Sequence, residues 1–141
     1  MPAPKNEWHK MKKVLFVCIE NACRSQMAEA FFNKYAKGAR AYSAGSKPAK
    51  EIDPKTVEVM KEKGMDLAGK APTGFQPHLS RGFDIIVTMG CKDSCPITPK
   101  EKTIDWEIEN PKGKPVEKYR EVQGIIERKV AELAKRLESS E

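Results

Sequence analysis

Two short apolar runs constrain the fold of this chain more than any other feature. They are Lys12 to Val17 (KKVLFV) and Phe83 to Met89 (FDIIVTM), and both are rich in β-branched side chains. Runs of this length and composition are typical of strands buried on both faces of a parallel sheet. Residues 39–45 (ARAYSAG) and 103–105 (TID) predict two further short strands.

Helical patterns separate these strands. From Ser25 to Tyr35, apolar residues recur at three- and four-residue spacing, and a longer stripe of the same kind runs from Val116 to Leu137. Between them, Asp53 is placed as an N-cap, with Pro54 at the first helical position and Gly64 after the last turn. Strands that alternate with helices predict an α/β fold with parallel strands and right-handed crossovers.

Length and composition limit the organisation and the partners. A chain of 141 residues suits one core, so we expect a polar tail over 1–11 and a single catalytic domain over 12–141. The net charge is +6, but basic and acidic residues are interleaved, which disfavours a nucleic-acid partner. No apolar run approaches the roughly 18 residues of a membrane span. Four cysteines without a secretory leader favour the reducing cytoplasm.

The corner between the first strand and the first helix concentrates reactive groups. The strand ends at Cys18, and the loop Ile19, Glu20, Asn21, Ala22 and Cys23 leads to Arg24. Free amides at a helix N-terminus bind anions, and the guanidinium of Arg24 matches two oxygens of a tetrahedral oxyanion. The same positive field favours a thiolate. We therefore expect Cys18 to be a nucleophile facing a bound oxyanion.

Other residues support this interpretation or leave it open. Ser25 follows the arginine and can donate its hydroxyl to the thiolate, and Asn21 tolerates the backbone angles of a tight loop. The two histidines, His9 and His78, are distant in sequence, which disfavours activation by histidine. No metal is predicted, although four thiolates could in principle bind zinc. The sequence pattern assigns no role to Cys23.

A second cysteine segment, Gly90 to Pro96 (GCKDSCP), follows the other buried strand. Ligands of open parallel sheets bind outside the carboxyl ends of the strands. We therefore expect Cys91 and Cys95 at the same edge of the sheet as Cys18. The glycine, serine and proline of this segment favour a loop that can carry a cysteine toward the first one.

The segment VCIENACRSQMAEA closely resembles the active-site loop of the low-molecular-weight tyrosine phosphatase superfamily, and specifically its arsenate reductase branch. YSAG, VTMGCKDSCP and NPKGK are similar to the same branch. The resemblance implies a three-layer fold in which helices flank a four-stranded parallel sheet of order 2-1-3-4. It implies no cofactor.

For the reaction, the resemblance implies that Cys18 attacks arsenate held by Arg24. Cys91 then attacks Cys18 and releases arsenite, and Cys95 attacks Cys91. The resulting disulfide would be reduced by thioredoxin or by another thiol reductant. A reductant other than thioredoxin stays open, because three residues separate Cys91 from Cys95, fewer than in the best-known thioredoxin-coupled branch.

One position departs from the superfamily pattern. Its general acid is an aspartic acid directly before a proline, and here Asn110 precedes Pro111. An amide cannot donate a proton as a carboxylic acid does. We expect arsenate reduction, which loses water or hydroxide, to depend less on that acid than ester hydrolysis does, and Glu109 or Asp105 could take its place. A phosphotyrosine phosphatase, which would act on a phosphorylated substrate, stays an alternative. So does a non-catalytic thiol module that binds arsenite or zinc or senses redox state.

Overall fold

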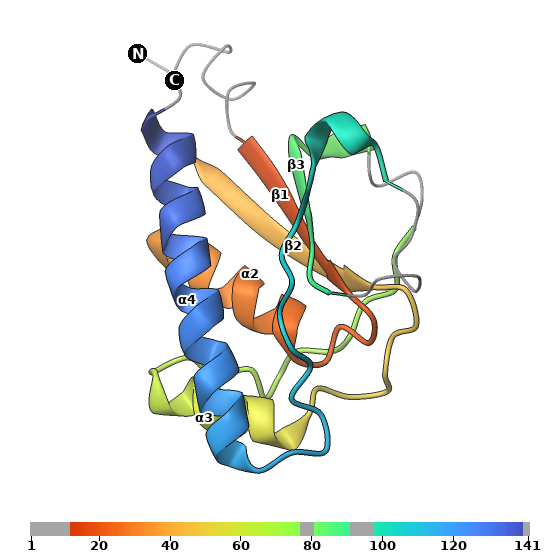
Figure 1. Cartoon of the computed structure of the whole chain (residues 1–141), viewed down its shortest axis with the longest axis vertical. Coiled ribbons are helices and arrows are strands. Elements are labelled where there is room, and N and C mark those ends of the chain that lie inside the picture. The colour runs from red at the N-terminus through yellow and green to blue at the C-terminus, as the bar shows by residue number, and fades with distance from the viewer. Residues whose placement is uncertain (1–11, 77–80, 91–97, 140–141) are drawn as a thin grey trace.

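The computed structural model describes residues 12–76, 81–90 and 98–139, so the predicted tail over 1–11 and both Cys91 and Cys95 lie outside the described residues. A four-stranded parallel sheet with the order β2-β1-β3-β4 forms the centre (Figure 1), which confirms the predicted order. The strands are β1 (Lys12–Cys18), β2 (Ala39–Gly45), β3 (Ile85–Thr88) and β4 (Thr103–Asp105). β1 pairs with β2 along its whole length, ending with Cys18 beside Gly45.

β3 is shorter than its apolar sequence predicts. The apolar run covers residues 83–89, but the strand spans only Ile85–Thr88. Phe83 packs in a cluster on one side of the sheet, and Met89 is buried in the core on the other. The apolar run therefore marks the buried residues, and these extend beyond the hydrogen-bonded strand at both ends.

Three α-helices and one 3₁₀ turn complete the described elements: α2 (Arg24–Tyr35), α3 (Pro54–Glu62), η3 (Lys100–Lys102) and α4 (Val116–Ser139). α3 begins as predicted, because an Asp53 carboxylate oxygen accepts a hydrogen bond from the Lys55 amide at 3.0 Å. Gly64 follows this helix with a φ of 80°, a conformation that glycine adopts without strain.

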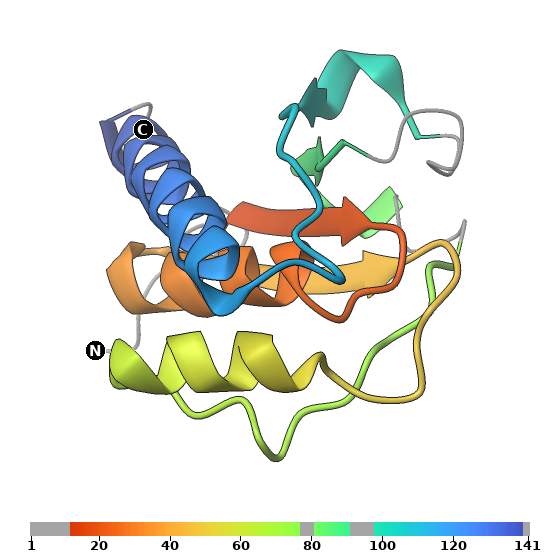
Figure 2. The ribbon, with the colours of Figure 1, turned by 60° about the horizontal axis from the view of Figure 1, so that its bottom comes forward.

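The helices bury one face of the sheet. α2 contacts β1, β2 and α4, and α3 packs against α4 (Figure 2). Val14 and Phe16 of β1 point into this larger core, whereas Leu15 and Val17 point to the opposite face. There they meet aromatic side chains from the connecting segment, Phe75 and Phe83. The sheet is thus covered on both sides, and its carboxyl edge is left for the site.

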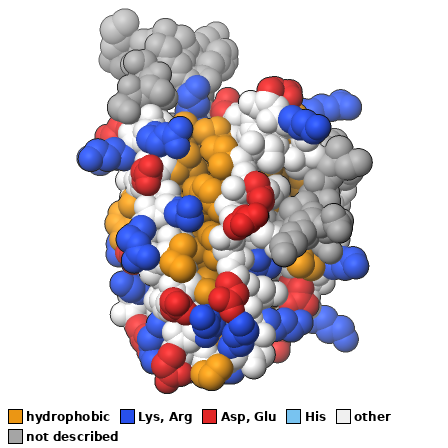
Figure 3. Space-filling model, viewed as in Figure 1, with side chains coloured by type: hydrophobic (Ala, Val, Ile, Leu, Met, Phe, Trp, Pro, Cys, Tyr) orange, Lys and Arg blue, Asp and Glu red, His pale blue; other side chains and the backbone are white. Residues whose placement is uncertain are grey.

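The surface in Figure 3 carries basic and acidic side chains interspersed rather than in separate patches. Within the described ranges, no helix combines the length and apolarity needed to cross a membrane. The same ranges hold no cluster of three or more histidine, cysteine or acidic side chains that could bind a metal ion.

Candidate active site

The loop between β1 and α2 turns sharply at Asn21. Its φ is 54°, and among the described residues other than glycine it alone has a positive φ. The side-chain oxygen of Asn21 accepts hydrogen bonds from the Thr73 amide at 2.7 Å and from Gln26 Nε2 at 3.0 Å. Asparagine tolerates this conformation better than most residues, and these bonds hold it there. The loop curl is therefore built into the fold.

Gly45 at the end of β2 lets the loop lie against the sheet. A Cβ atom at this position would lie 2.6 Å from the Ile19 carbonyl oxygen and 2.8 Å from the Asn21 nitrogen. Both neighbours are backbone atoms that cannot move without moving the loop. The YSAG segment contains this residue, but its local sequence carries no signal of the contact.

The sulfur of Cys18 is buried and held by two donors. The Asn21 amide donates to Sγ at 3.3 Å, and the Ser25 hydroxyl lies 2.8 Å from it. Ser25 Oγ also accepts a hydrogen bond from Asn21 Nδ2 at 2.7 Å, so its own hydrogen is free to point at the sulfur. Hydrogen bonds of this kind stabilise a negatively charged sulfur. Cys18 is thus placed as a nucleophile at the carboxyl edge of the sheet.

Arg24 is the first residue of α2 and its side chain is buried. Nη1 donates to the carbonyl oxygens of Met89, directly after β3, and of Ile108 at 3.0 Å. Nε is buried and has no hydrogen-bond partner within the described part of the chain. Because an unpaired buried donor costs free energy, an oxyanion that accepts from Nε would relieve that cost.

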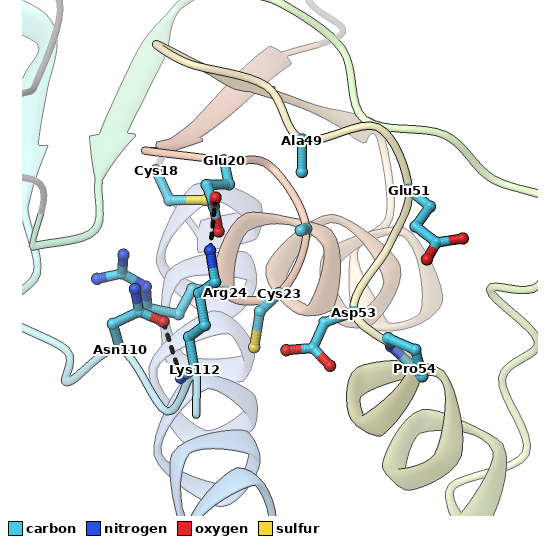
Figure 4. Close-up of a pocket in the computed structure, with 11 residues that line it drawn as sticks. Cys18, Glu20, Cys23, Arg24, Ala49, Glu51, Asp53, Pro54, Asn110 and Lys112 are labelled. Carbon is cyan, nitrogen blue, oxygen red and sulfur yellow. Dashed lines mark hydrogen bonds and ion pairs between the residues drawn. The ribbon is translucent and has the colours of Figure 1, made fainter. Parts of the chain in front are cut away.

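A pocket of about 290 Å³ opens over Cys18 and Arg24 (Figure 4). Its other lining residues are Glu20, Ala22, Cys23, Ala49, Glu51, Asp53, Pro54, Asn110 and Lys112. The predicted loop residues and Asn110 therefore come together, with Ile19 in an adjoining depression and with Asn21 and Ser25 buried behind the loop. Glu51, Asp53 and Lys112 also line the pocket, although sequence patterns did not single them out for the site.

Cys23 differs from Cys18 in its electrostatics. It is buried directly before α2, and its side chain makes no capping hydrogen bond to that helix. Burial raises the pKa of the Cys23 thiol to about 12. Cys23 is therefore a neutral thiol at physiological pH and a poor nucleophile.

Asn110, at the position of the superfamily acid, takes part in a turn. Its side-chain oxygen accepts a hydrogen bond from the Lys112 amide at 3.2 Å. The Lys112 ammonium reaches the loop and donates to Glu20 Oε2 at 2.8 Å (Figure 4). An ion pair between residues 92 positions apart in sequence thus lies at the pocket.

Comparison with known proteins gives a family match and several similar chains. The family model described as low molecular weight phosphotyrosine protein phosphatase matches residues 13–141. A glutaredoxin arsenate reductase of Synechocystis sp. is 32% identical over 126 residues, covering 87% of this chain and 96% of that protein. An arsenate reductase of Archaeoglobus fulgidus has a solved structure with 40% identity and a TM-score of 0.75, covering 86% of this chain and 98% of that one. A thioredoxin-dependent arsenate reductase of Corynebacterium glutamicum has 32% identity and a TM-score of 0.78, covering 97% and 72%.

Proposed function

The chain belongs to the low-molecular-weight phosphotyrosine protein phosphatase family, and from this premise we propose that it is an enzyme that reduces arsenate. The observation that carries the proposal is a contact between two segments. One is the loop of residues 18–24, called the anion loop from here on, and the other is the chain directly after β3. Arg24 donates to the Met89 carbonyl, so Gly90, the residue before Cys91, lies beside the oxyanion site. The second cysteine segment therefore begins directly after a residue that lies against Arg24, which lines the pocket of Cys18.

The proposed reaction is a relay of three cysteines. The Cys18 thiolate attacks arsenate held by Arg24 and the loop amides, forming a sulfur–arsenic bond and losing one oxygen as water. Cys91 attacks the Cys18 sulfur, and the electron pair of the sulfur–arsenic bond leaves with arsenic as arsenite. Cys95 then attacks Cys91, which frees Cys18 and leaves a Cys91–Cys95 disulfide.

An external thiol reductant closes the cycle in this proposal. Among the similar proteins, one is named glutaredoxin arsenate reductase and another thioredoxin-dependent arsenate reductase. We propose that thioredoxin or another thiol protein reduces the disulfide, that residues 12–141 act as a single catalytic domain, and that the reaction takes place in the cytoplasm. The cysteine content favours such a reducing compartment.

Two features of the pocket favour a small oxyanion over a phosphorylated tyrosine. Asn110 cannot protonate an ester leaving group, a step that is typically worth ~100-fold or more in rate. In addition, no aromatic side chain occurs among the described residues that line the pocket, although aromatic rings are usually recognised by stacking. Phosphatase activity remains the second candidate, because an anion loop of this kind holds phosphate equally well.

The deciding experiment counts thiols by intact mass before and after arsenate, in wild type and in Cys91→Ser. We expect wild type to lose two thiols only when arsenate is present, and peptide mapping to find them joined as Cys91–Cys95. Cys18→Ser should lose none. Full multiple turnover by Cys91→Ser would contradict the relay. Brisk hydrolysis of an aryl phosphate by that variant, without arsenate reduction, would favour the phosphatase.

A further inference from the structure

The pocket contains a cationic group that the proposed relay has not used. We propose that Lys112 is a further catalytic residue, which gives a proton to the oxygen that leaves arsenate when Cys18 attacks. This inference rests on the proposed function of the Cys18 site. It supplies the proton donor that Asn110 cannot be.

The position of Lys112 fits this role. It lines the same pocket as Cys18 and Arg24, and its ammonium donates to Glu20 on the anion loop at 2.8 Å. Asn110 supports this placement, because its side-chain oxygen accepts a hydrogen bond from the Lys112 amide. This bond fixes the direction in which the chain leaves the turn. Asn110 is thus a positioning residue for Lys112.

The other groups of the pocket are poor proton donors. Both carboxylate oxygens of Asp53 already accept hydrogen bonds, one from the Lys55 amide and one from the Tyr119 hydroxyl. The Cys23 thiol, with a pKa of about 12, holds its proton more tightly than an ordinary lysine does. Arg24 is a poor donor because a guanidinium group does not release a proton in proteins, and its Nη1 is bound to two carbonyl oxygens.

An ammonium group is suited to this proton transfer. It carries its proton at neutral pH, yet it is a far stronger acid than water, whose pKa is ~15.7. In the step, the Cys18 sulfur forms a bond to arsenic and one arsenic–oxygen bond breaks. The electron pair stays on that oxygen, which already bears one hydrogen, takes a second from Lys112 and leaves as water. Lys112 is left as a neutral amine, and because its side chain is 61% exposed it regains a proton from solvent.

Acidic side chains from two segments line the pocket together with Lys112. Glu20 faces it from the anion loop, and Glu51 and Asp53 line the pocket from the segment before α3. Arg24 is the opposing positive charge, on α2. On its own loop, the nearby carboxylate is Glu109, which is bound to Lys114 and Lys118. Arsenate has to compete with Glu20 for the ammonium, so the ion pair opens as the substrate binds.

The test compares Lys112→Met and Lys112→Arg with Lys114→Met. Lys114 is an exposed lysine of the same loop that pairs with Glu109 and does not line the pocket. Reduced protein is mixed with arsenate at pH 7, quenched with acid, alkylated and weighed, so that the rate of thiol loss in a single turnover is measured. Measuring at both low and saturating arsenate separates substrate capture from chemistry.

We expect Lys112→Met to lose about 100-fold in single-turnover rate, the usual effect of removing a general acid. Lys112→Arg should bind arsenate within about threefold of wild type but react as slowly as Lys112→Met, because arginine keeps the charge and cannot release a proton. Lys114→Met should match wild type.

Three outcomes would overturn the inference. If Lys112→Arg reacts at the wild-type rate, Lys112 supplies charge and no proton. If Lys112→Met behaves like Lys114→Met while wild type reduces arsenate, Lys112 has no part in the chemistry and the proposed function stands. If wild type shows no arsenate-dependent thiol loss, both the proposed function and this inference are wrong.

Discussion

Ser25 offers the most direct test of how the Cys18 sulfur is held. Replacing it by alanine removes the hydroxyl 2.8 Å from Sγ and leaves Asn21 Nδ2 without its acceptor. A hydrogen bond to a charged group contributes about 1.5–3 kcal/mol. We therefore expect Ser25→Ala to slow alkylation of Cys18 by iodoacetamide at pH 7 by about tenfold or more. Peptide mass spectrometry measures that rate.

The matched control is Ser46→Ala. The Ser46 hydroxyl is buried without a hydrogen-bond partner in the described structure, so its removal should leave the alkylation rate of Cys18 unchanged. Equal rates for Ser25→Ala and Ser46→Ala would show that the loop amides alone hold the sulfur.

Cys23 should lower the free energy of unfolding as the pH rises above about 8.5. Its pKa in the folded state is raised to about 12, chiefly by burial, whereas an unfolded cysteine ionises near ~8.5. The folded state therefore holds the proton longer, and the stabilisation is complete below pH 8.5 and is lost as the pH rises toward 12. The slope is at most about 1.4 kcal/mol per pH unit.

We expect the free energy of unfolding of wild type to fall more steeply between pH 8.5 and pH 10 than that of Cys23→Ala, as measured by urea titration. This window matters because the pKa of Tyr119 is also raised, by burial and by Asp53, so Tyr119 adds a loss of the same sign above pH 10. Parallel curves for the two proteins would contradict a buried neutral thiol at Cys23.

At the level of elements, the end of β3 depends on Gly90. Its φ is 75°, and a Cβ atom there would lie 2.9 Å from the Ile108 carbonyl oxygen and 3.1 Å from Arg24 Nη1. Gly113 has a similar φ of 81° but has open space around it. Gly113→Ala should therefore cost only the backbone strain, about 1–2 kcal/mol.

Gly90→Ala should cost more than Gly113→Ala in urea unfolding, because the added methyl group also displaces Arg24. It should in addition weaken phosphate binding, measured by calorimetry, by about tenfold, whereas Gly113→Ala should bind phosphate as wild type does. Unchanged phosphate affinity in Gly90→Ala would mean that Arg24 adjusts without leaving the site.

The elements were predictable because their signals are local. Asp53, Pro54 and Gly64 mark the ends of α3, and the short strand 103–105 matches its three-residue signal. The anion loop is likewise predictable, because the residues that form it are adjacent in sequence, from Cys18 to Arg24. The rest of the site rests on contacts between distant segments, such as Arg24 with Ile108, 84 positions away. No periodicity or cap encodes such a contact. The structure is therefore needed to show that Lys112 and Glu51 line the pocket and that Gly90 has no room for a side chain.

At the scale of the whole molecule, Glu127 joins three helical segments. It lies on α4, accepts a hydrogen bond from the Tyr35 hydroxyl of α2, and pairs at 3.2 Å with Lys63, which ends α3. The Tyr35 hydrogen bond, together with Lys63, lowers the pKa of the Glu127 carboxyl. A carboxyl with a lowered pKa in the folded state stabilises the protein above its unfolded pKa of about 4.3, and this contribution is lost as the pH falls through the folded value.

Glu127→Gln should therefore reduce the free energy of unfolding at pH 7 by up to about 1 kcal/mol, the usual limit for a partly exposed ion pair. The difference from wild type should shrink below pH 4.3, because the wild-type carboxyl is then increasingly protonated as well. Urea titrations at pH 7, 5 and 3 measure this, with Glu132→Gln, an exposed glutamate on the same helix, as the control. A difference that persists unchanged at pH 3 would show that Glu127 acts through packing, since the helices would then be joined without its charge.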